Sequence, residues 1–101
     1  MRFEKERPEG IYSIVIDFAG NEDPEELRVG IGFQPANRTS ETFLMAFYMI
    51  VVDDRYVPYG ISRTGQLPPV SLRRFAPAVA RCAYRFLEAH DMRVPVRTVE
   101  I

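Results

Sequence analysis

The sequence has few of the residues from which disulfides and metal sites are built. Of its 101 residues, one is cysteine, one is histidine and none is tryptophan. A lone thiol cannot form an internal disulfide, so we expect a reducing, cytoplasmic compartment. Without a second cysteine or histidine a zinc site lacks its usual ligands. We therefore predict no metal and no other cofactor.

Long apolar segments are also missing. The first ten residues, MRFEKERPEG, carry six charges and have no apolar stretch, unlike a secretory signal. The longest apolar run, residues 43–52, has ten residues, whereas a helix that spans a bilayer needs about 20. We expect a soluble protein with no membrane contact, folded as a single domain over residues 1–101, with residues 1–10 flexible.

Charge is unevenly spread along the chain. Residues 1–60 carry 6 basic and 11 acidic side chains, whereas residues 61–101 carry 7 basic and 3 acidic ones. The net charge of −1 argues against a general nucleic-acid binder, which needs a strongly basic surface. Arginine outnumbers lysine twelve to one, which reflects either genome composition or a functional preference.

Alternating apolar residues predict two strands near the N-terminus. Every second side chain is apolar from Tyr12 to Phe18 and again from Leu27 to Phe33. The sequence between them, GNEDPEE, is rich in turn-forming residues. An antiparallel hairpin follows. Gly30 and Gly32 fall on the outward side of its second strand, where small residues let another group approach closely.

The apolar run 43–52 predicts a third strand, because it is short and ends in the β-branched residues 50–52. Asp53 and Asp54 then form a turn into a fourth strand, YVPYGIS, which Pro58 confines to an edge or a bulge. Residues 93–101 predict a last strand. The run 43–52 is apolar on both faces, which is more surface than one helix covers, so we predict a homodimer through the sheet.

Residues 71–91 predict the helix, with its apolar side chains on one arc. The members of this arc are Leu72, Phe75, Ala76, Val79, Cys82, Ala83, Phe86 and Leu87. Ser71 suits an N-cap, but Pro77 would remove a hydrogen bond, so the helix either kinks or begins near Pro77. The predicted fold is α+β: an antiparallel sheet, with a four-strand meander plus a C-terminal strand, and one amphipathic helix packed on one face.

Arginines line the flank of this helix. Arg74, Arg81 and Arg85 lie on one side of the apolar arc, and guanidinium groups in a row suit the recognition of carboxylates or phosphates. The simpler explanation is a solvated helix face, on which Arg85 can pair with Glu88. The fourth strand and the loop after it add Tyr59, Arg63 and Gln66. Such an aromatic and polar group is typical of a recognition surface or of an ordinary connector.

Three functions remain open. The favoured one is a small non-catalytic interaction protein (adaptor, inhibitor, immunity-type or regulatory factor) that binds an acidic protein partner. Its predicted partner-binding residues are Arg74, Arg81, Arg85, Tyr59, Arg63 and Gln66. The second is a nucleic-acid-binding regulator that uses the same helix. The third is a small enzyme or enzyme subunit with a site shared across a dimer, whose acid–base candidates are Asp17, Asp53, Asp54 and His90. Because the sequence brings no two of these together, we predict no catalytic residue.

Overall fold

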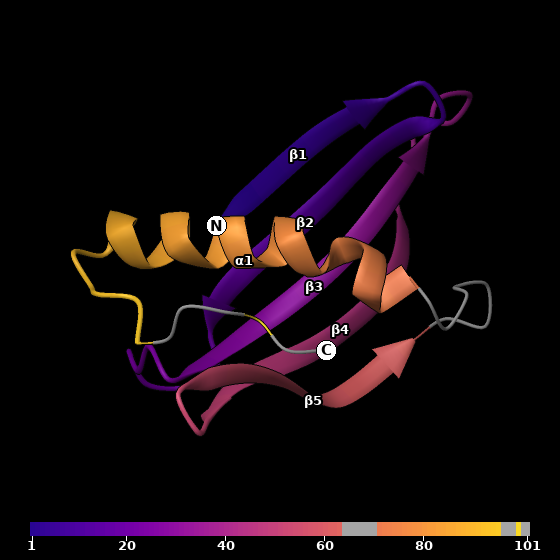
Figure 1. Ribbon diagram of the computed structural model, residues 1–101. Coiled ribbons are helices and arrows are strands. Elements are labelled where there is room, and N and C mark those ends of the chain that lie inside the picture. Colours follow the sequence, from indigo (N-terminus) through magenta and orange to yellow (C-terminus); the bar gives the residue numbers. More distant parts are fainter. Residues whose placement is uncertain (64–70, 96–98, 100–101) are drawn as a thin grey trace.

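The computed structural model describes residues 1–63, 71–95 and 99, and within them five strands precede one helix. The elements are β1 (Arg2–Arg7), β2 (Gly10–Phe18), β3 (Glu26–Pro35), β4 (Thr42–Val52), β5 (Arg55–Arg63) and α1 (Ser71–Ala89). The strands form one antiparallel sheet in the order β1-β2-β3-β4-β5, so β1 and β5 are its edges. α1 lies across one face (Figure 1). The α+β prediction is confirmed.

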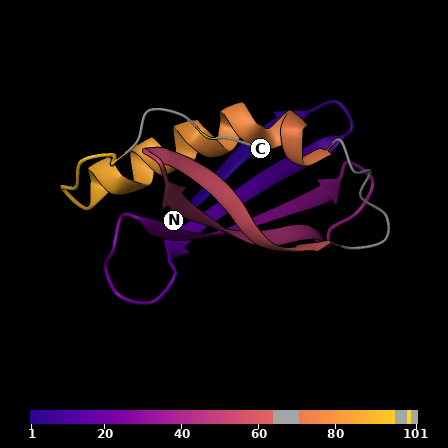
Figure 2. The ribbon, with the colours of Figure 1, turned by 60° about the horizontal axis from the view of Figure 1, so that its bottom comes forward.

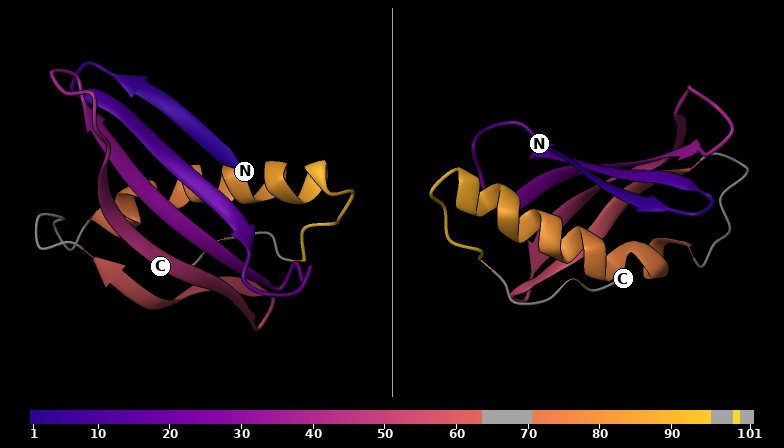
Figure 3. Two further views of the ribbon diagram at one scale, coloured as in Figure 1. Left: turned by 180° about the vertical axis from the view of Figure 1, so that it is seen from behind. Right: turned by 90° about the horizontal axis from the view of Figure 1, so that it is seen from above.

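The core lies between α1 and the sheet face beneath it. Along β2, β3 and β4 most apolar residues on this face are buried and most residues on the other face are more exposed, as the predicted periodicity requires. Ser13 and Gly32 are exceptions, because both are buried on the other face. In β4, Met45, Phe47 and Met49 are buried, whereas Tyr48 and Val52 on the opposite face are exposed. The opposite face carries no other element of the described chain, as the view from behind shows (Figure 3).

The helix buries the predicted apolar arc. Seven of its eight members are buried, and Ala76 is half-buried. Each large apolar side chain contributes about 1.5–3 kcal/mol when it is fully buried. Pro77, which lies inside the continuous helix, costs about 3 kcal/mol. Packing therefore outweighs the proline, and the helix begins at Ser71 and continues through Pro77.

β1 is the strand that sequence patterning did not reveal. We expected residues 1–10 to be flexible, but Arg2–Arg7 pairs antiparallel with β2. Only Phe3 is apolar in this strand, and it packs against the core. A charged edge strand gives no hydrophobic alternation, although charge is the usual protection of an exposed edge.

Among the described residues, the fifth strand of the sheet is the N-terminal β1. Of the predicted last strand, residues 93–101, only 93–95 and 99 are among the described residues. Val99 forms a single parallel bridge with Tyr56 of β5. The remaining residues of that prediction lie outside the described part.

The turn between β4 and β5 and the glycines of β3 can be compared with what the sequence indicated. Asp53 and Asp54 connect β4 to β5 with positive φ angles of 51° and 60°, the backbone of a tight hairpin turn. Of the two glycines expected to allow a close approach, Gly32 does so, whereas no atom lies within 4 Å of a Cβ placed at Gly30. A Cβ at Gly32 would lie 2.5 Å from Oε1 of Glu41 and 2.9 Å from Oγ of Ser13.

The space above Gly32 holds the contact that fixes the start of β1. The Arg2 guanidinium donates a hydrogen bond to Glu41, and the Ser13 hydroxyl donates another to the same carboxylate at 3.1 Å. The hydrogen bond from Arg2 holds the pKa of Glu41 below its ordinary value. The segment before β4 is thereby tied across β2 to the edge strand.

Replacing Glu41 by Gln should lower the free energy of unfolding at pH 7 by about 0.5–1 kcal/mol, because the pair is partly exposed. The folded pKa of Glu41 lies below its unfolded value near 4.5. Its contribution is therefore present above pH 4.5 and is lost as the pH falls through the folded pKa. Urea unfolding of both proteins between pH 7 and pH 2.5 measures this, with Glu26→Gln as the exposed control. A difference between wild type and variant that does not shrink on acidification would contradict the assignment.

Candidate functional site

A groove between the flank of α1 and β1 gathers basic side chains from both elements. Its volume is about 490 Å³. Its floor includes the apolar residues Phe3, Ile14, Phe75, Ala78 and Cys82. The basic residues that line it are Lys5, Arg7, Arg74, Arg81 and Arg85. The groove therefore combines an apolar floor with five cations.

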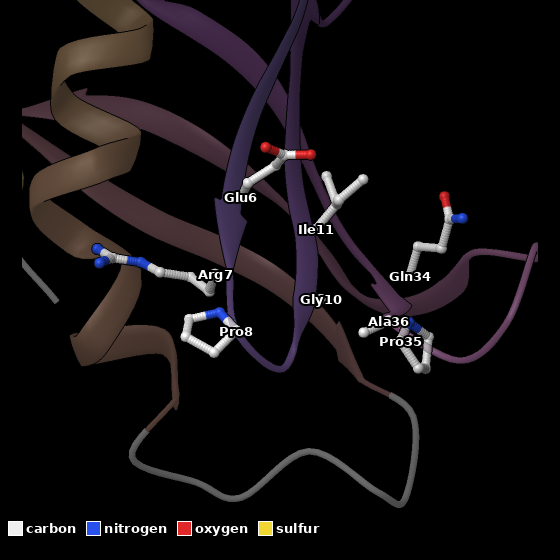
Figure 4. Close-up of a pocket in the computed structure, with 8 residues that line it drawn as sticks. All are labelled: Glu6, Arg7, Pro8, Gly10, Ile11, Gln34, Pro35 and Ala36. Atoms are coloured by element: carbon white, nitrogen blue, oxygen red, sulfur yellow. The ribbon is translucent and has the colours of Figure 1, made fainter.

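The strand register explains why the cations of β1 face the helix. Lys5 pairs with Tyr12 of β2, and the Tyr12 ring lies 5.6 Å from the Phe75 ring of α1, centroid to centroid. Because side chains alternate along a strand, Phe3, Lys5 and Arg7 lie on the helix side of the sheet. Figure 4 shows the Arg7 side chain extending toward α1.

The arginines of α1 are poorly neutralised within the chain. In the described part, neither Arg81 nor Arg85 has a carboxylate oxygen within 4.0 Å. The Arg85–Glu88 pair that the sequence allowed is thus not formed there. A guanidinium nitrogen of Arg74 lies 3.8 Å from a carboxylate oxygen of Glu9. The Cζ atom of Arg74 lies over the Tyr12 ring, 5.5 Å from its centroid. Like charges held along one groove produce a positive potential that attracts anions.

One acidic residue also lines the groove without neutralising it. Glu4 belongs to β1 and pairs with Ser13 of β2. This register directs its side chain to the open face of the sheet. There it accepts a hydrogen bond from Arg2 at 2.9 Å.

Cys82 contributes a thiol to the groove floor and has the properties of a small apolar residue. It is 8% exposed. Burial raises the pKa of the thiol, although Arg81 and Arg85 act in the opposite direction. A neutral buried thiol is a poor nucleophile.

The six residues predicted to bind a partner separate into two groups. Arg74, Arg81 and Arg85 lie together in the groove, whereas Tyr59 and Arg63 belong to β5 at the other edge of the sheet. Gln66 is outside the described residues. The sequence analysis missed Lys5 and Arg7. The only signal was their alternation with Phe3, which two intervening glutamates obscured.

In the described residues, no hydrogen bond or ion pair links Asp17, the Asp53–Asp54 turn and His90 to one another. Asp17 lies 3.4 Å from the amino terminus, Asp53 and Asp54 form the β4–β5 turn, and His90 follows α1. The His90 ring packs on Phe86 at 4.5 Å between centroids. Across residues 1–63, 71–95 and 99, no three His, Cys, Asp or Glu side chains gather closely enough to hold a metal ion.

A second hollow, of about 580 Å³, lies where the β1–β2 turn meets the end of β3 (Figure 4). Pro8, Gly10, Gln34 and Pro35 contribute to its lining. Its two charged residues, Glu6 and Arg7, have opposite signs. This hollow therefore has no net charge and offers less basis for recognition than the basic groove.

Comparisons with protein-family models, with curated proteins and with solved structures found no match for this chain. Among the described residues, no helix has both the length and the apolar character needed to cross a bilayer. The function is therefore argued from the groove itself.

We predict that Cys82 reacts with iodoacetamide at pH 8 at least about tenfold more slowly than free cysteine, because its thiolate fraction and its accessibility are both reduced. Mass spectrometry over time measures the rate, and the protein unfolded in urea is the control. Labelling of the folded protein as fast as that of free cysteine would show that the groove floor is open and the thiol reactive.

Proposed function

We propose that this protein is a non-catalytic interaction protein that binds an acidic region of a partner protein in the groove between α1 and β1. The observation that carries the proposal is the convergence of five cations from two elements, four of which have no carboxylate partner in the described chain. Guanidinium groups bind carboxylates through paired, charge-assisted hydrogen bonds. An acidic segment would supply the missing counter-charges.

The apolar floor favours a protein over a nucleic acid. Phe3, Phe75 and Cys82 would bury apolar atoms of a partner between its charged groups, which is how interfaces gain affinity beyond electrostatic attraction. A phosphate backbone offers no such atoms at the groove floor. The net charge of −1 also disfavours the broad, salt-sensitive contact that nucleic acid requires. Binding would mask the acidic region, as expected of an adaptor, an inhibitor, an immunity-type protein or a regulatory factor.

Reversing the charges of Arg81 and Arg85 to Glu should weaken partner binding at least about 100-fold, because two charge-assisted contacts become repulsive. The partner is first captured from a lysate of the source cells, with and without nuclease, and its Kd is then measured by calorimetry. Arg38→Glu with Arg93→Glu changes the net charge equally at exposed positions outside the groove and should leave binding intact.

Equal affinity of the groove variant and the wild type would contradict the proposal. A captured species that disappears with nuclease, and whose affinity falls steeply with salt, would favour the nucleic-acid alternative. Both variants are compared with the wild type by circular dichroism, so that loss of binding is not confused with loss of the fold.

We also propose that the open face of the sheet forms a homodimer. Tyr48, Val52 and Tyr59 are 38%, 45% and 64% exposed there, and Tyr48 pairs directly with Tyr59 across β4 and β5. Exposed aromatic residues next to half-buried aliphatic ones are typical of interfaces. The single buried thiol suits a reducing compartment, and we propose that the dimer acts in the cytoplasm.

Sedimentation velocity at micromolar concentration should give twice the chain mass of 11.6 kDa. The double variant Val52→Asp with Tyr59→Asp should sediment as a monomer, because each new carboxylate would be desolvated in the interface. The variant should keep the circular dichroism spectrum of the wild type. A wild-type protein that sediments as a monomer over the same range would contradict the dimer.

A further inference from the structure

The free edge of β1 offers backbone hydrogen bonds beside the basic groove. Met1 and Ile16 exchange both backbone hydrogen bonds, at 2.6 and 2.9 Å. In an antiparallel pair, hydrogen-bonded and non-hydrogen-bonded positions alternate. Phe3, Lys5 and Arg7 therefore bond to β2, and the N–H and C=O groups of Arg2, Glu4 and Glu6 point outward. No other strand of the described chain pairs with this edge.

The two faces of β1 differ in charge. On the helix side lie Phe3, Lys5 and Arg7, next to the arginine flank of α1. On the open side lie Arg2, Glu4 and Glu6, where Arg2 is already paired with Glu4 and Glu41. Side chains directly opposite one another on neighbouring strands lie about 5 Å apart. An added strand would therefore meet cations with one set of alternate side chains and carboxylates with the other.

We infer that an extended acidic segment of the partner binds as a sixth strand, paired with β1. Its carboxylates occupy alternate positions that face Lys5, Arg7, Arg81 and Arg85. Its intervening side chains are neutral or basic, because they lie over Glu4 and Glu6. The backbone ladder supplies affinity and the alternation of charge supplies specificity. This inference rests on the proposed function and specifies the form of the acidic partner.

The charge of the edge excludes a second copy of this chain as the occupant. Two β1 strands paired with each other would bring Lys5 and Arg7 of both chains together on the helix side. Like charges on neighbouring strands are destabilising, and lysine on an edge strand is a known protection against such self-pairing. The same cations attract an acidic strand.

Synthetic peptides test the inference directly. The probe is an acetylated and amidated octapeptide, ETETETET, in which glutamate alternates with threonine, a small residue that favours strands. Its block isomer, EEEETTTT, has the same charge and composition without alternation, and KTKTKTKT reverses the charge. Calorimetry at low salt should show the alternating peptide binding at least about tenfold more tightly than the block isomer, with no binding of the lysine peptide.

A matched pair of variants separates the backbone ladder from the charge. Glu4→Pro removes an outward N–H that takes no part in the pairing with β2, and edge strands tolerate such a change. Glu4→Ala removes the same charge and keeps the N–H. The proline variant should bind the alternating peptide about tenfold more weakly than the alanine variant, as expected for the loss of a ladder hydrogen bond. Hydrogen exchange gives an independent readout, because the amides of Glu4 and Glu6 should become protected only in the complex.

The possible outcomes distinguish failure of strand addition from failure of the proposed function. In one outcome, the double variant Arg81→Glu with Arg85→Glu abolishes binding, the Glu4→Pro and Glu4→Ala variants have the same affinity for the alternating peptide, and both acidic peptides bind with the same affinity. The acidic-partner function then stands and strand addition is overturned. If the charge reversal leaves capture of the natural partner unchanged, the proposed function itself fails. No binding at millimolar peptide, or a tighter complex with an oligothymidine of eight nucleotides, also overturns the inference. Should Glu4→Pro unfold, the exchange of Glu4 and Glu6 in the wild-type complex decides the question.

Discussion

The packing of α1 on one face of the sheet is the contact on which the rest of the molecule depends. The helix buries seven apolar side chains against β2, β3 and β4 and tolerates an internal proline. Since Phe75 meets Tyr12 near the start of β2 and Phe86 meets Phe18 near its end, the helix is held at both ends of the strand. This docking turns the Arg74–Arg85 flank toward β1 and creates the basic groove. The view along the sheet shows the helix on one side only (Figure 2).

Short connections between the strands determine which residues lie on the same surface of the molecule. An antiparallel meander keeps the strands in chain order, so β1 and β5 are separated by the full width of the sheet. The basic groove forms at the β1 edge. Tyr59 lies at the other edge, where it forms the exposed aromatic pair of the open face with Tyr48. The molecule thus presents a charged surface beside one edge and an apolar surface on the opposite face. Acidic-partner binding and self-association would use different parts of the fold.

The sequence predicted the elements whose apolar residues are periodic. The period of two in β2 and β3 and the apolar arc of α1 correspond to what the fold buries, whereas only one face of the apolar run in β4 is buried. It did not reveal β1, because a charged edge strand obtains its order from pairing with β2 and from the Arg2–Glu41–Ser13 contact, neither of which has a local pattern. Half of the groove was missed for the same reason. The arginine flank was recognisable from helical spacing. That Lys5 and Arg7 lie opposite this flank follows only from the register of β1 against β2.

Binding of an acidic partner in the groove between α1 and β1 should change the surroundings of the backbone amides that line it. Backbone amide shifts, followed by NMR during titration with the captured partner or its acidic segment, test it most directly. The perturbed amides should cluster in residues 3–7 and 74–85, while the shifts of the β5 amides should not change. Perturbations centred on β5 or on the open face of the sheet, with β1 and the α1 flank unchanged, would contradict it.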